Sequence, residues 1–117
     1  MFHGEKLRNL HFLRVSSRLQ KAKITNLDFT KAIKNAKSGD LIYFDPPYIP
    51  LTPTASFSAY AMDGFGQKDQ EKLAETIKEL TSIGVFVILS NSDTQLTRKI
   101  YGKSSVSYTH LTLPTIL

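Results

Sequence analysis

Cysteine is absent from the 117 residues, and its absence excludes several kinds of chemistry. Without thiols the chain cannot form disulfides, use a cysteine nucleophile, or bind zinc or an iron–sulfur cluster through sulfur ligands. The three histidines, His3, His11 and His110, are scattered, and their spacing matches no metal-ligand motif. We therefore expect no metal centre, in a chain that is compatible with a reducing compartment.

Long apolar runs are lacking as well. The longest, Val85 to Leu89, falls far short of the roughly 20 residues that a membrane helix requires. The basic N-terminus is not followed by the apolar core of a signal peptide. Apolar residues make up 41% and charged residues 21%, which is ordinary for a folded protein, and the length suits one small domain. We expect a soluble, cytoplasmic protein that does not enter a membrane.

The net charge of +5 is concentrated near the N-terminus. Residues 1–23 carry six basic side chains against Glu5 alone, whereas the remaining residues balance nine basic against nine acidic side chains. A basic stripe suits contacts with nucleic-acid phosphates. The same pattern is also typical of a solvated helix face, and charge alone favours that simpler interpretation.

Hydrophobic periodicity predicts alternating helices and strands. We expect helices at 6–21, 29–36, 67–82 and 94–101, and strands at 23–27, 41–44 and 85–89. Asp28 suits the start of the second helix and Gly39 its end. The run at 41–44 is continuously apolar, which is typical of a strand buried on both faces. This order indicates an α/β fold with a parallel central sheet.

Polar clusters occur where predicted strands end. They are Asp28, the run Asp45-Pro46-Pro47-Tyr48, and Ser90 to Asp93. Ligands bind at the carboxyl ends of strands in parallel sheets, so these clusters are the candidate site.

The run from Asp45 to Tyr48 fits the methylation of an exocyclic aromatic amine. The lone pair of such an amine is delocalised into the ring, and two hydrogen-bond acceptors would draw it out of the ring plane. The Asp45 carboxylate is one acceptor, and the Pro46 carbonyl is a second, held by two stiff prolines that lack an N–H. Tyr48 offers a flat face on which a base could stack.

A purely structural interpretation of the same run is a strand-ending turn with a capping aspartate and a surface tyrosine. The context favours the chemical interpretation. A buried strand precedes the run, and a loop at 50–66 with Phe57, Tyr60 and Phe65 follows it. These aromatic residues could close over a base held outside the helix stack.

Several segments together resemble the Dam-type (D12 class) adenine-N6 DNA methyltransferases. The matching segments are 26–29, Gly39-Asp40, 43–51, 65–70 and 89–92, within a similarity that covers roughly Lys6 to Lys103. The resemblance implies S-adenosylmethionine as cofactor and double-stranded DNA with a flipped adenine as substrate. It also implies a partial Rossmann-like methyltransferase domain at 1–103, and it allows a restriction endonuclease as partner.

The resemblance assigns a role to each matching position. Asp45 would hold the target amine and lie near the methionine part of the cofactor. Pro46 would supply the carbonyl acceptor, which Pro47 helps to hold in place, and Tyr48 would supply the stacking face. Asp28 and Phe29 match an acidic-aromatic pair that binds the cofactor's adenine. From the residues alone, they are more simply a helix cap and a core residue.

The chain departs from this family at both ends. The glycine-rich cofactor loop and the segment that recognises the DNA sequence are not found, so we expect Met1 to be an internal methionine of a longer reading frame. Residues 104–117 are similar to a translated adapter sequence, and we expect a non-native tail; the alternative is a diverged strand.

Two other functions remain open. Related motifs, usually with Asn at the position of Asp45, methylate RNA bases or glutamine side chains. The other is an inactive nucleic-acid-binding fragment, whose Pro-Pro turn would be structural and whose DNA binding would survive Asp45→Ala.

Overall fold

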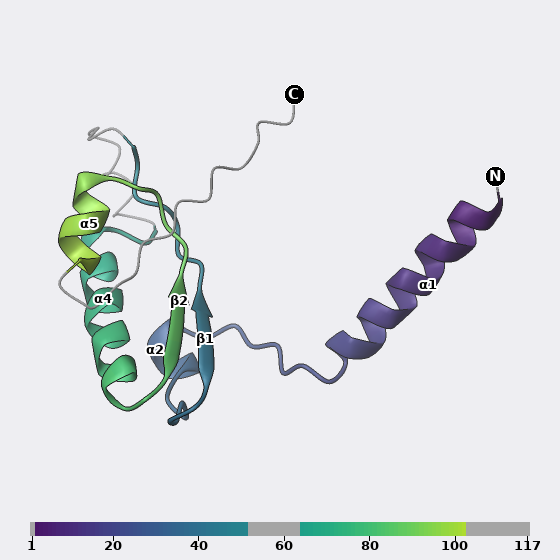
Figure 1. Cartoon of the computed structure of the whole chain (residues 1–117), viewed down its shortest axis with the longest axis horizontal. Coiled ribbons are helices and arrows are strands. Elements are labelled where there is room, and N and C mark those ends of the chain that lie inside the picture. The colour runs from purple at the N-terminus through teal and green to yellow at the C-terminus, as the bar shows by residue number, and fades with distance from the viewer. Residues whose placement is uncertain (1, 52–63, 103–117) are drawn as a thin grey trace. The chain divides into compact units, whose positions relative to one another are not determined.

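The computed structural model describes residues 2–51 and 64–102, which fall into two compact units, Met1–Lys34 and Asn35–Leu117 (Figure 1). The first unit contains helices α1 (Phe2–Leu19) and α2 (Phe29–Ala32). The second contains strands β1 (Leu41–Phe44) and β2 (Phe86–Leu89), and helices α4 (Gln67–Ser82) and α5 (Gln95–Tyr101).

Helix α1 confirms the helix predicted at 6–21, with both ends shifted toward the N-terminus. Its apolar residues do not form one stripe, and its side chains from Gly4 onward are exposed, including Leu10 at 53% and Phe12 at 80%. No face of α1 is therefore covered by other described residues. No helix in the described part of the chain is long and apolar enough to cross a membrane.

The strand predicted at 23–27 is wrong, because this segment has no regular structure. A strand is stabilised by pairing with a neighbour, and the first unit contains no other strand among its described residues. Ile24 is 81% exposed.

Helix α2 is shorter than predicted and ends at Ala32 rather than Ala36. Its start is confirmed: Asp28 Oδ1 accepts hydrogen bonds from the Thr30 amide at 3.0 Å and the Thr30 hydroxyl at 2.5 Å. Gly39, predicted to end this helix, instead has φ of +90° in the turn that leads into β1.

The second unit confirms the predicted parallel pairing. Strands β1 and β2 lie side by side in register, with Leu41 opposite Phe86 and Phe44 opposite Leu89. Parallel strands need a long connection, and α4 lies within it, packed against β2 and α5 (Figure 1). The observed architecture is thus a small α/β unit with a two-stranded parallel sheet.

Helix α4 forms as its sequence predicts. The Gly66 amide donates to Asp69 Oδ2 at 2.9 Å at its start, and Gly84, with φ of +89°, follows its end. The apolar face packs into the core of the unit. The buried apolar residues of the unit are Phe44, Ile49, Leu73, Ala74, Ile77, Leu80, Val85 and Tyr101.

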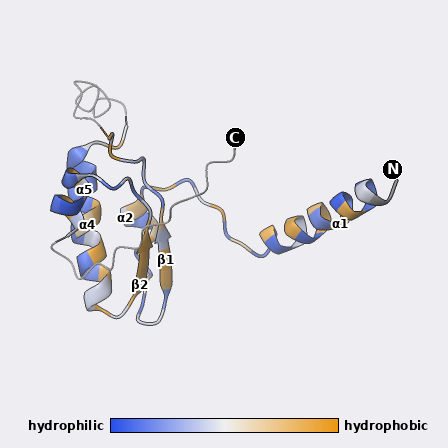
Figure 2. Cartoon of the chain, turned by 45° about the horizontal axis from the view of Figure 1, so that its top comes forward, coloured by the Kyte–Doolittle hydropathy of each residue, from blue (hydrophilic) through white to orange (hydrophobic). Residues whose placement is uncertain are grey.

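The prediction that β1 is buried on both faces is wrong for the described residues. Leu41 and Tyr43 are 65% and 61% exposed, and their partners Phe86 and Ile88 are 66% and 51% exposed. Side chains alternate between the faces of a sheet, so these four residues share one face. Figure 2 shows mostly hydrophobic colour on both strands, although one face lacks a covering layer among the described residues.

Candidate active site

The carboxyl ends of β1 and β2 bring two predicted clusters together. Because the strands pair in parallel register, Asp45 and Ser90 follow directly from the opposed residues Phe44 and Leu89. The Ser90 amide continues the ladder by donating to the Phe44 carbonyl at 3.0 Å. The sheet therefore places both clusters at the same edge.

A hydroxyl links the carboxylate to the aromatic ring of the predicted site. The Ser90 hydroxyl donates to Asp45 Oδ1 at 2.5 Å, and it accepts a hydrogen bond from the Tyr48 hydroxyl at 3.2 Å. The Asp45 side chain is exposed, and Tyr48 is 56% exposed. Within the described part of the chain, Asp45 Oδ2 accepts no hydrogen bond, and the exposed ring of Tyr48 lies nearby.

The two prolines differ in how their carbonyls are used. The Pro47 carbonyl accepts a hydrogen bond from Gln70 Nε2 at 2.8 Å. Within residues 2–51 and 64–102, no donor forms a hydrogen bond with the Pro46 carbonyl. The predicted acceptor is therefore the proline carbonyl that remains available in this part of the chain.

The residue after Tyr48 is fixed by the turn that follows β2. The Ile49 amide donates to Asn91 Oδ1 at 3.0 Å, and the Ser92 hydroxyl donates to the Ile49 carbonyl. Ile49 itself is 3% exposed. We call Gln70, Asn91 and Ser92 the turn clamp, because they hold the backbone on both sides of Tyr48.

The turn clamp is connected to α5 through a buried tyrosine. Gln70 Oε1 accepts hydrogen bonds from Asn91 Nδ2 at 3.1 Å and from the Tyr101 hydroxyl. Burial disfavours the charged phenolate and raises the pKa of Tyr101 above its ordinary value. Tyr101 therefore donates to the clamp as a neutral phenol.

Asp28 and Phe29, predicted to bind the cofactor, belong to the first unit. Asp28 caps α2, as its simpler interpretation required, and Phe29 is the first residue of that helix. Their predicted role, binding the adenine of the cofactor, stays a prediction. Phe57 and Tyr60, predicted to close over the base, lie outside the described residues.

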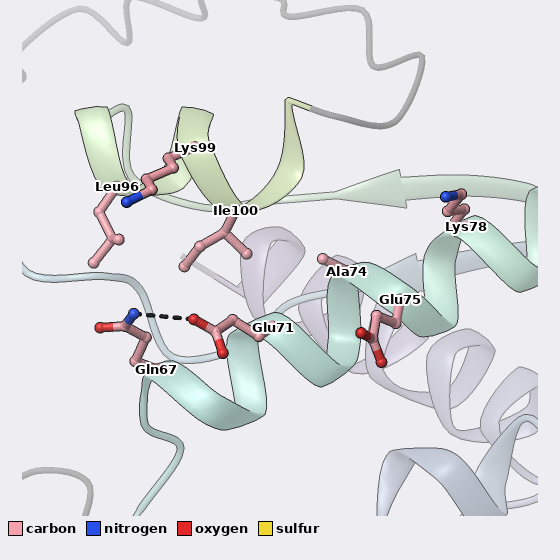
Figure 3. Close-up of a pocket in the computed structure, with 8 residues that line it drawn as sticks. All are labelled: Gln67, Glu71, Ala74, Glu75, Lys78, Leu96, Lys99 and Ile100. Atoms are coloured by element: carbon pink, nitrogen blue, oxygen red, sulfur yellow. Dashed lines mark hydrogen bonds between the residues drawn. The ribbon is translucent and has the colours of Figure 1, made fainter.

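A surface hollow of about 400 Å³ lies between α4 and α5 (Figure 3). Leu96 and Ile100 of α5 line it opposite Ala74 of α4. At one end, Gln67 Nε2 donates to Glu71 Oε1 at 3.0 Å. The hollow includes none of the predicted site residues.

The sequence interpretation missed Gln70 and Tyr101. Gln70 precedes an apolar stripe of α4: Gln70, Leu73, Ala74 and Ile77 follow the spacing i, i+3, i+4, i+7 of one helix face. A polar residue at the first position of that stripe was the available signal. Tyr101 gave no such signal, because a tyrosine at the end of a helix is common on surfaces.

The chain is similar in sequence to known proteins. The family model of the D12 class N6 adenine-specific DNA methyltransferases matches residues 5–112. A Type II methyltransferase, M1.LlaDCHI of Lactococcus lactis subsp. cremoris, is 51% identical over 79 residues, which is 68% of this chain and 28% of the relative.

Two further relatives carry the name DNA adenine methylase. One from Vibrio cholerae serotype O1 is 38% identical over 87 residues, covering 74% of this chain and 31% of the relative. One from Escherichia coli K12 is 36% identical over 78 residues, covering 67% of this chain and 28% of the relative. The chain thus spans 28–31% of the length of these curated relatives. Since the family model matches most of its length, the chain belongs to the D12 class of N6 adenine-specific DNA methyltransferases.

Proposed function

We propose that this chain carries the target-amine part of an enzyme that transfers a methyl group from S-adenosylmethionine to adenine N6 in DNA. One observation carries the proposal: the exposed Asp45 carboxylate is oriented by Ser90 at the end of β1, next to Tyr48. Membership of the D12 class supports adenine N6 in DNA as the target.

The chemistry starts with the two acceptors of the turn. Asp45 Oδ2 and the Pro46 carbonyl accept one hydrogen bond each from the two N–H groups of the amine. These bonds favour tetrahedral geometry at nitrogen and turn its lone pair out of the ring plane. The Asp45 carboxylate also stabilises the positive charge that develops on the nitrogen, and it can accept the proton released when the amine returns to neutrality.

The residues present suit a sulfonium methyl donor. The turn presents a carboxylate and a carbonyl, both of which tolerate a cation, and the described residues place no lysine or arginine in contact with Asp45. When bound, S-adenosylmethionine would supply an electrophilic methyl group. Asp45 would lie near its methionine part, and Asp28 and Phe29 would contact its adenine. Holding two reactants in line contributes roughly 7–11 kcal/mol when the alignment is ideal.

The substrate base has to leave the DNA stack to reach Asp45. Extruding an adenine costs roughly a few kcal/mol, and stacking on Tyr48 offsets part of that cost. The proposed substrate is double-stranded DNA with a flipped adenine. A chain that acts on bacterial DNA would work in the cytoplasm.

The proposal extends to the organisation of the protein. Residues 1–103 would form part of a Rossmann-like catalytic domain, and residues 104–117 a non-native or divergent tail. The name Type II methyltransferase of the lactococcal relative makes a restriction endonuclease a candidate partner.

A chimera tests the proposed function, because the chain spans 28% of the lactococcal relative. The matched 79-residue segment of that relative is replaced by the segment of this chain, and labelled methyl transfer to DNA, RNA and protein is measured. We expect label in DNA only, recovered as N6-methyladenine. Label in RNA or on glutamine would support the alternative transferases.

The Asp45→Ala change in this chimera separates catalysis from binding. We expect roughly a 10²–10³-fold fall in kcat, the scale on which loss of one preorganised hydrogen-bond partner acts. The matched control is Glu79→Ala, which removes an exposed carboxylate from the far part of α4. The non-catalytic alternative would be favoured by two results together. The chimera would transfer no methyl group before the change, and its DNA binding would survive Asp45→Ala.

A further inference from the structure

We infer that Gln70 is a positioning residue, whose side-chain amide fixes the Pro47–Ile49 backbone so that Tyr48 faces the target base. The inference rests on the proposed function. Gln70 is 1% exposed, and it is one of the two largest fully buried side chains among the described residues. A polar side chain at such a position needs a reason, since burying an amide is unfavourable unless its hydrogen bonds are made.

The amide of Gln70 makes three hydrogen bonds, each to a different element. Its Nε2 donates to the Pro47 carbonyl at 2.8 Å, directly inside the site turn. Its Oε1 accepts from Asn91 Nδ2 at 3.1 Å, in the turn after β2, and from the Tyr101 hydroxyl of α5. The residue therefore joins α4, α5 and both strand ends through one planar group.

These bonds act on the backbone after Pro47, whose conformation the two proline rings do not restrict. The rings of Pro46 and Pro47 restrict φ, and Pro47 also restricts ψ of Pro46, so the peptide plane after Pro47 is the one that needs another constraint. The bond from Gln70 to the Pro47 carbonyl fixes the plane between Pro47 and Tyr48. Asn91 fixes the next plane, between Tyr48 and Ile49, through the Ile49 amide, and Ser92 fixes the plane after it through the Ile49 carbonyl.

Gln70 also determines how Asn91 acts. An asparagine amide can rotate by half a turn, which would exchange its oxygen for its nitrogen at the Ile49 amide. Because Gln70 Oε1 accepts from Asn91 Nδ2, the oxygen of Asn91 is left to accept from Ile49. Loss of Gln70 would thus loosen both sides of Tyr48, even though Gln70 contacts only one of them.

The test compares Gln70→Met with Ile77→Ala in the full chain. Methionine is similar in size to glutamine but has no amide. Ile77 is the control because it is buried on the same face of α4, two turns further on, and its side chain cannot form a hydrogen bond with the turn. Amide hydrogen exchange is followed at Ile49 and at Phe86, whose amide donates to the Asp40 carbonyl within the sheet.

We expect Gln70→Met to accelerate exchange at Ile49 at least 10-fold more than at Phe86. Ile77→Ala should accelerate the two amides by similar factors, because it only lowers the stability of the unit. Equal acceleration at both amides in Gln70→Met would overturn the inference, whatever the chimera does.

The second readout is the activity of the chimera described above. We expect Gln70→Met to lower kcat at least 10-fold while KM for S-adenosylmethionine changes less than threefold, and Ile77→Ala to leave kcat near that of the unchanged chimera below its unfolding temperature. A kcat unaffected by Gln70→Met would also overturn the inference. An unchanged chimera that transfers no methyl group would instead count against the proposed function, and the exchange measurement would still decide the role of Gln70.

Discussion

The Ser90 hydroxyl lies 2.5 Å from Asp45 Oδ1 and donates a hydrogen bond to it, although 45 positions separate the two residues in the sequence. The parallel register of β1 and β2 produces this contact, because it aligns the residues that follow each strand. The contact selects one orientation of the carboxylate, and the proposed function assigns its other oxygen to the target amine.

Replacing Ser90 should therefore impair catalysis without removing the carboxylate. Hydrogen bonds to charged groups contribute about 1.5–3 kcal/mol, and exposure of Asp45 to water favours the lower end of that range. We expect Ser90→Ala to lower kcat of the chimera about 10-fold. Ser82→Ala is the matched control, since its hydroxyl bonds only to the Glu79 carbonyl at the end of α4. Equal kcat in the two variants would show that the contact does not orient Asp45.

Tyr48 should act through its ring more than through its hydroxyl. Stacking of a base on an aromatic side chain contributes about 1–3 kcal/mol. We expect Tyr48→Ala to raise KM of the chimera for unmethylated DNA about 10-fold. Tyr48→Phe keeps the ring and loses only the 3.2 Å bond to Ser90, so its KM should change less than threefold. If both variants raised KM alike, the stacking role would be wrong.

The turns at Gly84 and Gly39 should differ in their tolerance of a side chain. Both have φ near +90°, which costs other residues about 1–2 kcal/mol. A Cβ at Gly84 would lie only 2.5 Å from Ser38 Oγ, whereas a Cβ at Gly39 would meet nothing within 4 Å. We expect Gly84→Ala to lower the free energy of unfolding of the chain more than Gly39→Ala does.

Urea unfolding of the full chain, followed by tyrosine fluorescence, measures that difference. Gly4→Ala is the control, because it lies in α1 with open space around it and should leave the stability of the second unit unchanged. A larger loss from Gly39→Ala than from Gly84→Ala would contradict the predicted clash with Ser38.

Stability should fall at alkaline pH because of Tyr101. Desolvation raises the pKa of this phenol in the folded state, so the folded chain keeps a proton that the unfolded chain releases above about pH 10. The unfolded state is then favoured as pH increases, with a limiting slope of about 1.4 kcal/mol per pH unit. Below about pH 10 both states hold the proton, and Tyr101 adds no pH dependence.

Urea unfolding between pH 8 and pH 11 tests this slope. Tyr101→Phe should lower stability at pH 8, where it removes the hydrogen bond to Gln70, and should show a shallower decline above pH 10. Tyr43→Phe is the control, because that side chain is 61% exposed in the folded chain and should leave the decline unchanged. If stability declined identically in Tyr101→Phe and in the unchanged chain, Tyr101 would not be the cause of the decline.

The sequence by itself determined the features that depend on neighbouring residues. The apolar spacing of α4, the continuous apolar runs of β1 and β2, and the cap at Asp28 each arise within a few residues, so they could be predicted. The strand end at Asp45 was equally local, because proline cannot continue a ladder. The expected strand at 23–27 was wrong because a strand depends on a partner that its own residues do not supply.

Only the tertiary structure decided which side chains meet. Ser90 contacts Asp45, 45 positions away, and Gln70 contacts Pro47, 23 positions away. Hydrophobic periodicity describes neighbouring residues only, so it does not predict contacts over such separations. Burial followed the same rule, since β1 has an apolar sequence throughout and yet leaves Leu41 and Tyr43 exposed. Whether a face is covered depends on the elements packed against it, and packing is a property of the folded chain as a whole.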